Sequence, residues 1–499
     1  MRTTFSGISI ALRALQAQQH SLDITGHNVA NVNNPNFSRQ SALHAATRPY
    51  PMPMMGYTPS SGQMGTGVEI SQIVRMRDSF VEMRLRQQLH SLNYWESLKD
   101  GLTQVELFFN EPTENGIHAA LDLFWDSLQD LSREPEFEAV REVVVQRAQV
   151  VVEAIRNTRE HLQEMRENLN TNIPIKVSEV NSLAARIADL NVQIGKISAT
   201  GSLPNDLMDS RDALLEDLSK LVDIEVVQDH AHMIGVTIGG ASLVHRSTSY
   251  ELGINAVPTE EENYAKNEIF WTATGGAVEI KSGEIGGMRQ LRDQEVQDFM
   301  DKLDKWTFQF ADAFNKIHNK GYDLDGNGGG EPLYFFVFDN STDDDGYVWP
   351  EGELGFAALN IRVNPNIAEN VRLIRASSKN VNPGEDDPGA VGNGLNALEL
   401  ARLRFTPPRG SEITIEEAFN AIISNLGVVT QKSLKMVENE KVLANHLTNL
   451  RESVSGVSLD EEMANMIRFQ HAYGAAARMM TAVDETLDVI INRLGIVGR

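Results

Sequence analysis

Two apolar stripes, one near each end of the chain, dominate its hydrophobic pattern. The first follows a spacing of four and three residues, with polar or small residues in its two gaps, and comprises Ile8, Leu12, Leu15, Leu22 and Val29. The second steps by three or four residues without a break and comprises Met466, Phe469, Tyr473, Ala476, Met480, Val483, Leu487, Ile490 and Leu494. Such spacing is typical of helices that pack along one seam. We therefore expect long N- and C-terminal helices paired as a coiled coil, with these residues as a subunit-packing seam.

The first stripe stops at an asparagine-rich stretch, NVANVNNPNF at residues 28–37. Asparagine tolerates the left-handed backbone conformation and closes turns with its side chain, and proline cannot continue a helix. The stretch therefore predicts a fixed change of direction, a joint between the terminal helix and a globular body. The residues assigned to this joint are Asn28, Asn31, Asn34, Pro35 and Phe37.

The second stripe predicts a helix over residues 459–494. Ser458, followed by Glu461 three residues later, has the pattern of a capping box at its start. Gly456 precedes this cap and is expected to act as a hinge.

Between the two ends the pattern is mainly helical with inserted β-structure. Residues 70–222 have helical periodicity, and Pro112, Pro135 and Pro174 are expected to mark breaks in it. From residue 224 to about 281 the pattern changes to short β-branched runs with glycines, such as MIGVTIGG, which predict strands. Helical periodicity returns near residue 299 and again after residue 411, on either side of a Gly-, Asp- and Pro-rich region with short strands.

The expected fold class is mainly α with inserted β, built from a terminal coiled coil, a helical-bundle body and a small β-rich insertion domain. Residues 1–40 and 457–499 are assigned to the terminal coiled-coil assembly domain. Residues 41–223 and 284–456 are assigned to the mainly helical body, and residues 224–283 to the β-rich outer insertion domain. This order allows the two terminal helices to lie side by side and to cover each other's apolar face.

Composition excludes several classes of chemistry. The 499 residues contain no cysteine, which removes disulfides, thiolate metal sites and cysteine nucleophiles. A net charge of -25 argues against a nucleic-acid partner, because phosphate binding requires clustered Lys and Arg. No apolar run is long enough for a membrane span, and the N-terminus lacks the apolar region of a secretory signal peptide. Acidic residues are also sparse at the start, where Asp23 is the only one before Glu69.

The candidate metal and catalytic motifs are incomplete. DLDGNGGGEPLY places Asp323, Asp325, Asn327 and Gly328 at calcium-loop positions, but Tyr334 stands where the bidentate glutamate should be. His230 and His232 share a strand face without an evident third zinc ligand. The carboxylates Asp343 and Asp345 lie in a turn-rich segment, and no phosphate loop, nucleophile elbow or zinc-protease helix occurs. We therefore expect no enzyme activity, no metal and no cofactor.

The stretch GISIALRALQAQQHSLDITGHNVANVNNPNFSRQ, residues 7–40, closely resembles the N-terminal motif of bacterial flagellar axial proteins of the rod, hook and hook-associated kind. In that family the motif runs Asn-x-x-Asn-x-x-Thr-Pro-Gly-Tyr, and Asn28, Asn31, Pro35 and Phe37 take the matching places. Asn34 and Asn36 stand where Thr and Gly are usual, and Phe37 replaces Tyr. Within the family, four further stretches look like those of the hook-associated proteins of the first hook–filament junction: GTGVEISQIVRMRDSFVEMRLRQ, GSLPNDLMDSRDALLEDLSKLVDIEV, NKGYDLDGNGG and SGVSLDEEMANMIRFQHAYGAAARMM.

This resemblance implies a structural protein that polymerises at the distal end of the hook and joins hook to filament. It implies export through the flagellar type III apparatus without a cleaved signal peptide, and an extracellular location in the flagellum. The implied partners are further copies of the chain in a ring-like polymer, hook protein, the second hook–filament junction protein and a type III export chaperone. Neither nucleic acid nor membrane insertion is expected.

Three alternatives stay open at this point. Another axial component, such as a hook or distal-rod protein, shares the asparagine-rich motif. An exported enzyme such as a wall hydrolase would need a carboxylate pair in a cleft. A cytosolic coiled-coil scaffold would carry denser charges beside its seam than residues 8–29 do.

Overall fold

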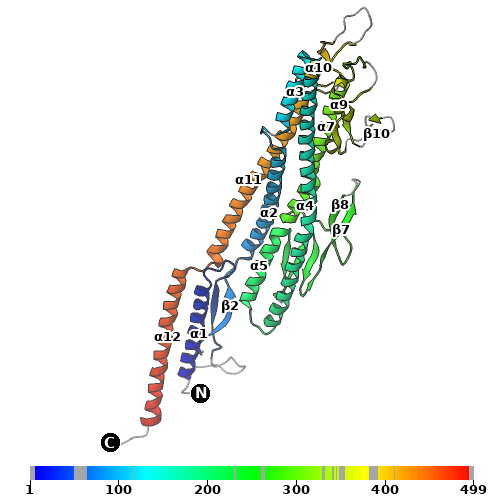
Figure 1. Ribbon diagram of the computed structural model, residues 1–499. Coiled ribbons are helices and arrows are strands. Elements are labelled where there is room, and N and C mark those ends of the chain that lie inside the picture. Colours follow the sequence, from blue (N-terminus) through cyan, green and yellow to red (C-terminus); the bar gives the residue numbers. More distant parts are fainter. Residues whose placement is uncertain are drawn as a thin grey trace, which may run out of the picture.

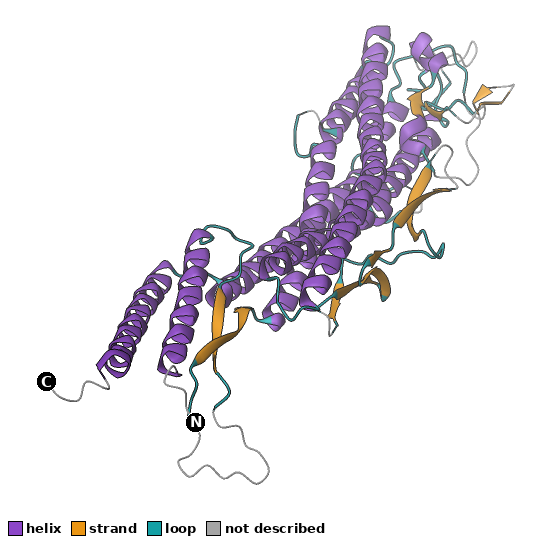
Figure 2. Cartoon of the chain, turned by 90° about the horizontal axis from the view of Figure 1, so that it is seen from below, coloured by secondary structure: helices purple, strands orange, loops and turns teal. Residues whose placement is uncertain are grey.

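The chain forms an elongated rod in which both termini lie at the same end (Figure 1). The computed structural model describes residues 6–49, 64–114, 116–229, 232–259, 264–328, 332–339, 342–343, 346–347, 355–380, 391–408 and 411–493. Helices dominate and the strands are short and inserted between them, which confirms the predicted fold class (Figure 2). None of the described helices combines the length and apolar character needed to cross a membrane.

The terminal end of the rod consists of two helices and one hairpin. Helix α1 (Ser6–Ala30) lies beside α12 (Leu459–Asp488), and the antiparallel hairpin of β1 (Gln40–Ala46) and β2 (Val68–Arg75) packs next to α1. Ser458 caps α12 by accepting a hydrogen bond from the backbone N–H of Glu461, which is one half of the predicted capping box. The carboxylate of Glu461, which would supply the other half, binds Arg39 at 2.7 Å. A short π-helical turn, Val489–Arg493, follows α12. The hairpin's first strand is not among the elements that the sequence pattern predicts.

Five helices form the body of the rod. They are α2 (Ser79–Phe109), α3 (Ile117–Arg133), α4 (Glu138–Ser198), α7 (Val296–His318) and α11 (Ile415–Ser455). Pro112 and Pro135 lie between helices, as predicted. The helix starts use standard caps: Asp78 accepts from the first turn of α2, and Thr414 with Glu417 forms a capping box on α11.

An aromatic cluster fills the core of the body. Phe310 lies 6.5 Å from Phe124 and 5.1 Å from Phe336 between ring centroids, and Phe314 lies 5.0 Å from Phe335. Several shorter elements at the end of the rod opposite the termini close over this core. They are β9 (Phe336–Phe338), α8 (Ala357–Asn360), β12 (Ile361–Val363), α9 (Pro365–Glu369), the 3₁₀ turn Val371–Leu373 and α10 (Leu395–Arg402). Between β9 and α8 in the chain, β10 (Thr342–Asp343) and β11 (Gly346–Tyr347) form a separate two-stranded hairpin.

A second core lies lower on the rod, where the inserted strands pack on helices. The antiparallel sheet β3-β4-β5-β6 and the hairpin β7–β8 cover the C-terminal half of α4 and helix α5 (Asn205–Leu221). The strands are β3 (Glu225–Gln228), β4 (Ile234–Ile238), β5 (Ala241–His245), β6 (Thr248–Ser249), β7 (Leu252–Pro258) and β8 (Ala265–Trp271). The chain returns to the body through α6 (Gly283–Gln290) and the π-helical turn Leu291–Glu295. The β-segment therefore shares its core with two helices instead of enclosing one of its own.

Helix α4 joins the two cores, and it contradicts the predicted break at Pro174. The helix runs for 61 residues through Pro174, a length of about 92 Å. A proline in a helix leaves the carbonyl four residues earlier without its N–H donor. Here the side-chain amide of Asn267 in β8 donates to that carbonyl, the oxygen of Asn170, at 2.8 Å.

The same contact fastens the β-insertion to the helix. The side chain of Asn170 accepts from the backbone N–H of Asn267 at 2.8 Å and donates to the carbonyl of Ala265 at 2.9 Å. Arg292 donates to the same Asn170 side-chain oxygen at 2.8 Å. The proline thus creates a free acceptor on α4, and the edge of β8 occupies it.

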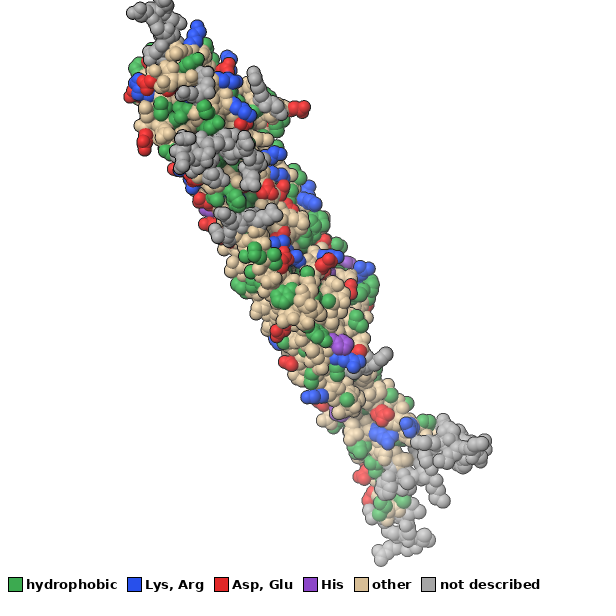
Figure 3. All heavy atoms as spheres, turned by 90° about the vertical axis from the view of Figure 1, so that its right-hand side faces the viewer, with side chains coloured by type: hydrophobic (Ala, Val, Ile, Leu, Met, Phe, Trp, Pro, Cys, Tyr) green, Lys and Arg blue, Asp and Glu red, His purple; other side chains and the backbone are tan. Residues whose placement is uncertain are grey.

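On the face of the rod that Figure 3 shows, side chains of Lys and Arg are interspersed with those of Asp and Glu. This distribution fits a chain that stays in solution before it contacts other molecules.

We predict that Asn267→Ala destabilises the chain by about 1 kcal/mol, because the carbonyl of Asn170 loses its donor. In a Pro174→Ala background the same substitution should cost less, because the backbone N–H of position 174 then supplies a donor to that carbonyl. Urea unfolding of the four proteins measures this coupling. An equal cost in both backgrounds would show that Asn267 does not compensate for the proline.

Candidate functional site: the joint between the terminal helices and the body

The asparagine-rich stretch forms a series of tight turns that lead the chain away from α1. The backbone N–H of Asn34 donates to the carbonyl of Asn31 at 2.9 Å, and that of Phe37 donates to the carbonyl of Asn34 at 3.1 Å. The side chain of Asn31 caps α1 by donating to the carbonyl of His27 at 3.0 Å. None of the described residues 28–37 has a positive φ, so the expected left-handed backbone is wrong here. The asparagines act through side-chain hydrogen bonds instead.

Asn28 is the buried centre of the joint, with 1% of its surface exposed. Its side chain accepts from the backbone N–H of Gln40 at 3.0 Å and donates to the carbonyl of Gln40 at 2.9 Å. The amide also donates to Glu462 of α12 at 3.1 Å. One side chain therefore connects α1, the start of β1 and α12.

Pro35 is exposed and Phe37 is half-buried at the turn. The ring of Phe37 lies edge-on to His27 with 5.2 Å between centroids, so it anchors the chain against the last turn of α1. Asn34 accepts from the backbone N–H of Asn36 at 3.2 Å, which closes the turn around the proline.

The next three residues, Ser38, Arg39 and Gln40, together bind residues of α1, α5, α11 and α12. Ser38 donates to Asp209 of α5 through its backbone N–H at 3.0 Å and through its hydroxyl at 2.6 Å. Arg39 binds Glu462 of α12 at 2.9 Å, and its backbone N–H donates to the last carbonyl of α11, that of Ser455, at 2.9 Å.

Gln40 completes the link to α5. Its amide donates to Asp206 at 2.8 Å, and its side-chain oxygen accepts from Asn205 at 3.2 Å. The stretch from Ser38 to Gln40 thus ties the terminal helices, the hairpin and the lower end of the body together.

A charged cluster lies directly beneath this stretch. Arg75 binds Asp209 at 2.7 Å and Asp212 at 2.8 Å, and Arg77 binds Glu82 at 2.9 Å. These five side chains are only 7–16% exposed. The arginines come from β2 and its exit, the acids from α5 and α2, so the cluster fixes the hairpin onto the body.

The cluster shifts the pKa values of its acids in opposite directions. Burial alone would raise the pKa of Asp212, but Arg77, Arg75 and Arg211 outweigh it and hold that pKa below its usual value. Burial raises the pKa of Glu82, and Arg77 only partly offsets the effect. The cluster therefore depends on the charged form of Asp212.

The elbow between α11 and α12 requires a glycine. A Cβ atom at Gly456 would lie 2.3 Å from the carbonyl oxygen of Glu452. Arg451, near the end of α11, binds Glu216 of α5 at 2.6 Å, so the elbow is held from both sides. Between the elbow and the asparagine-rich turns is an open polar cavity of about 500 Å³.

The predicted seam is only partly covered within one chain. Leu12, Tyr473 and Ile490 remain 46%, 39% and 43% exposed, whereas Ala476 and Leu487 are buried. The remaining described positions are half-buried: Ile8, Leu15, Leu22, Val29, Met466, Phe469, Met480 and Val483. Leu494 lies outside the described residues.

The face of α1 that is buried in the chain lies mainly one residue before the predicted stripe. Its members are small or polar: Ala11, Ala17, Ser21, Thr25 and Asn28. Ser21 contacts His44 of β1 at 3.1 Å, and a Cβ at Gly7 would lie 3.2 Å from Val483 of α12. Small side chains let α1 approach its neighbours closely, and the larger apolar ones stand beside that face.

The sequence-predicted metal positions have other partners. Asp323 is buried and accepts from the backbone N–H groups of Asp325 and Asn327 at 2.9 and 2.8 Å. Arg372 binds Asp325 at 2.6 Å and so supplies the cation of this loop. His230 and Asp345 lie outside the described residues, as does the side chain of Asp343.

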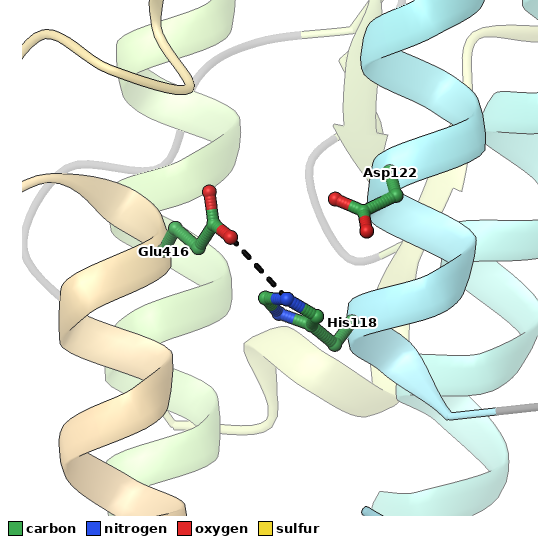
Figure 4. Close-up of side chains that lie close together, drawn as sticks. All are labelled: His118, Asp122 and Glu416. Carbon is green, nitrogen blue, oxygen red and sulfur yellow. Dashed lines mark ion pairs between the residues drawn. The ribbon is translucent and has the colours of Figure 1, made fainter. Parts of the chain in front are cut away.

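One group among the described residues has the composition and spacing of a metal site, with His118 and Asp122 on α3 and Glu416 on α11 (Figure 4). Their ligand atoms lie within 4.8 Å of one another, and His118 pairs with Glu416 at 3.3 Å. Arg404 binds Asp122 at 2.6 Å and Glu416 at 3.4 Å. A guanidinium thus already balances both carboxylates, and the group works as an ion-pair cluster that ties α3 to α11.

We predict that Asp212→Asn destabilises the chain at pH 7 by roughly 3 kcal/mol, because it leaves Arg75 and Arg77 short of a buried partner. The folded-state pKa of Asp212 is depressed, so its contribution exists above the unfolded value near 3.8 and is lost as pH falls through the lower folded value. Urea unfolding from pH 7 to pH 3 should therefore show a flatter pH dependence for the variant. Asp217→Asn, at an exposed position of the same helix, is the control. Equal pH profiles of the variant and the unmodified chain would contradict the role of Asp212.

Comparisons with known proteins place matches along most of the chain. A family model described as the helical domain of flagellar hook-associated protein FlgK matches residues 102–336. A model for flagella basal body rod protein matches residues 8–37, and one for the C-terminal region of flagellar basal body rod FlgEFG protein matches residues 451–494. The two rod matches cover the terminal helices and the joint.

Whole-chain similarity is found to several relatives. Flagellar hook-associated protein 1 of Bacillus subtilis is 33% identical, with 100% of each chain covered. The proteins of the same description from Salmonella typhimurium and Escherichia coli are 26% and 25% identical, with 97% of this chain and 99% of theirs covered. The flagellar hook junction protein FlgK from Burkholderia pseudomallei has the same fold, with a TM-score of 0.62 at 16% identity over 74% of this chain and 100% of that one. The chain belongs to the family of flagellar hook-associated protein 1 and is a structural component of the bacterial flagellum.

Proposed function

We propose that the chain polymerises at the distal end of the hook and forms the junction between hook and filament. The observation that carries this proposal is the partly uncovered apolar seam on two helices that are already paired. Leu12, Tyr473 and Ile490 keep 46%, 39% and 43% of their surface exposed. Neighbouring exposed apolar residues of the C-terminal helix, such as Met463 and Ile467, widen the stripe. Apolar surface of this extent on a helix pair is typical of a protein interface.

The seam supplies the free energy of assembly in this proposal. Each Å² of apolar surface that neighbouring copies cover contributes about 25 cal/mol before ordering costs are subtracted. Because the body covers little of α1 and α12, these two helices bury the most additional apolar surface when neighbouring copies pack against them. Subunit packing by these helices builds the inner tube.

The joint gives the polymer its stiffness. Asn28, Arg39 and Glu462 connect the terminal pair to the hairpin, and Ser38 connects it to α5. Load carried by the inner tube therefore passes into the body through buried polar contacts instead of a loose linker.

We assign three functional regions to the rod. Residues 1–40 and 457–499 form the assembly region, residues 41–223 and 284–456 the body, and residues 224–283 the outward β-region. The shared core of the β-strands with α4 and α5 supports a β-region that moves with the body.

The partners proposed for this role are further copies of the chain, hook protein and the second hook–filament junction protein. The chain leaves the cell through the type III export apparatus without a cleaved signal peptide. An export chaperone holds the apolar face of α12 before export, since Met463, Ile467 and Tyr473 leave that face exposed. The chain itself has no catalytic role in this scheme.

A second candidate is another axial component, such as a hook or distal-rod protein. The matches of residues 8–37 and 451–494 to rod families support it, because the terminal helices alone do not distinguish the members. The match of residues 102–336 to the hook-associated helical domain favours the junction role. Immunogold labelling of isolated hook–filament structures separates the two: label at the hook–filament boundary supports the junction, and label along the hook or rod overturns it.

We predict that Ile490→Asp abolishes incorporation into the flagellum and leaves thermal unfolding of the isolated chain unchanged, because the side chain is exposed and the charge would be buried only between copies. Quantitative immunoblots of isolated hook–filament structures measure incorporation. Ile490 lies in the π-helical turn that follows α12, and Thr481→Asp, which adds the same charge at an exposed position of α12 itself, serves as the control. If the Ile490 variant were incorporated as well as the unmodified chain, the seam would not be the contact between copies.

A further inference from the structure

A groove on the body is lined by acidic side chains and has an apolar floor. It lies between α2 and α4 beside α6 and has a volume of about 460 Å³. Its carboxylates are Glu96, Asp100, Glu164 and Glu284, and no Lys or Arg is among the described residues that line it. Phe108, Met165, Leu169, Met288 and Leu291 provide the apolar surface. The acidic groove, so defined, has the chemistry to receive a segment that carries both lysines and aliphatic side chains.

The charge of the acidic groove is only partly balanced from within the chain. Asp100 pairs with Lys99 at 2.6 Å and Glu284 with Lys176 at 3.1 Å. Among the described residues, Glu164 pairs only with the imidazole of His161, at 3.6 Å, and its side chain remains 70% exposed. Net negative charge therefore remains at the groove.

Helix α11 presents an exposed face with two lysines and two valines, on which Glu438 is the one acidic residue between Lys435 and Val442. Val428, Lys432, Lys435 and Val442 lie on the side of α11 that points away from α2, by the 3.6-residue helical repeat. All four are exposed, and the valines keep 64% and 63% of their surface accessible. Neither lysine forms an ion pair with any described residue. We call these four residues the lysine face.

The two surfaces agree in length. Val428 and Val442 are fourteen residues apart, roughly 21 Å along the helix, and the groove runs along α2 from Asn93 to Phe108, roughly 22 Å. Two valines spaced along the face can rest on the apolar floor while the lysines between them meet carboxylates on the rim.

The lysine face cannot occupy the groove of its own chain. The groove-lining residues of α2 centre on Gly101, whereas Gln88, which donates to Glu440 of α11, lies on nearly the opposite side of α2 by the helical repeat. Helix α11 therefore covers one side of α2, and the groove opens on the other. The occupant must be a different molecule.

We propose that the lysine face of one copy docks in the acidic groove of a second copy of this chain. The inference rests on the proposed polymerisation and adds a contact between bodies to the contact between terminal helices. A face that meets a different surface on its neighbour makes a heterologous contact, which generates rings or helical arrays instead of closed dimers. Complementary charge sets the register of the bodies around the array.

Cysteine cross-linking tests the contact, because the chain has no cysteine of its own. Full-length chain carrying Lys435→Cys and Glu164→Cys is expressed in place of the unmodified chain, and isolated hook–filament structures are oxidised. The expected result is a ladder of dimers and higher multimers, with no ladder from either single variant. Lys441→Cys paired with Glu164→Cys is the matched control, since Lys441 is exposed on the same helix but lies about 120° around it from Lys435.

Four outcomes would overturn the inference. Normal incorporation without a ladder would refute this contact and leave the proposed function standing, whereas absence of the chain from the hook–filament boundary would refute the proposed function itself. Dimers from Lys435→Cys alone would point to a two-fold contact. A cross-link from Glu164→Cys alone to a protein of another size would point to a different occupant.

Charge reversal gives a second, independent readout. Lys432→Glu with Lys435→Glu should lower incorporation about tenfold or more, because like charges then face each other. Adding Glu96→Lys and Glu164→Lys should restore it, and thermal unfolding of all variants should match the unmodified chain. Failure of the compensating pair to restore incorporation would contradict the contact.

Discussion

The fixed path of the chain through Ser38, Arg39 and Gln40 is the constraint on which the rest of the structure depends. These residues bind Asp209, Glu462 and Asn28, which belong to three different helices. A buried polar group without a partner costs free energy of folding, and a hydrogen bond forms only in a narrow range of directions. These contacts therefore permit one arrangement of the terminal helices on the body. Apolar packing alone would leave the terminal helices free to slide against the body. The joint converts two long helices and a rod-shaped body into one continuous unit.

The terminal helices show how one helix can serve both the chain and the polymer. Residues such as Ala11 and Ser21 let α1 lie close to α12 and the hairpin, while Leu12 stands beside that face and remains half-exposed. The larger apolar side chains are therefore left for contacts outside the chain. On the body, the lysine face and the acidic groove show the same separation, since the two surfaces lie on different sides of the α2–α11 pair and the charge of the groove is only partly balanced within the chain. Assembly surfaces thus follow directly from what the internal packing leaves uncovered.

Local signals in the sequence were sufficient for the helices, for the terminal pairing and for the position of the joint, because periodicity, caps and turn residues act over a few positions. The same local signals fail where a residue far away in the sequence determines the local structure. Pro174 predicts a break, and only Asn267, almost a hundred residues later, removes it. Glu462 and Asp209 are ordinary helix acids until the fold brings them to residues 38–40, and the group of His118 and Glu416 is equally invisible in sequence. The one hint of these contacts in the sequence was Arg39, a cation in a segment with almost no acidic residues of its own to pair with.

Distance measurement between spin labels across the joint tests the central claim most directly. Labels at Glu438→Cys on α11 and Gln470→Cys on α12, both exposed positions, report the angle at the elbow in a chain otherwise free of cysteine. A joint held by Arg39 and Glu462 predicts one narrow distance distribution, which Glu462→Ala broadens. A broad distribution in the unmodified chain, unaffected by Glu462→Ala, would show that the terminal helices swing freely and would contradict the account.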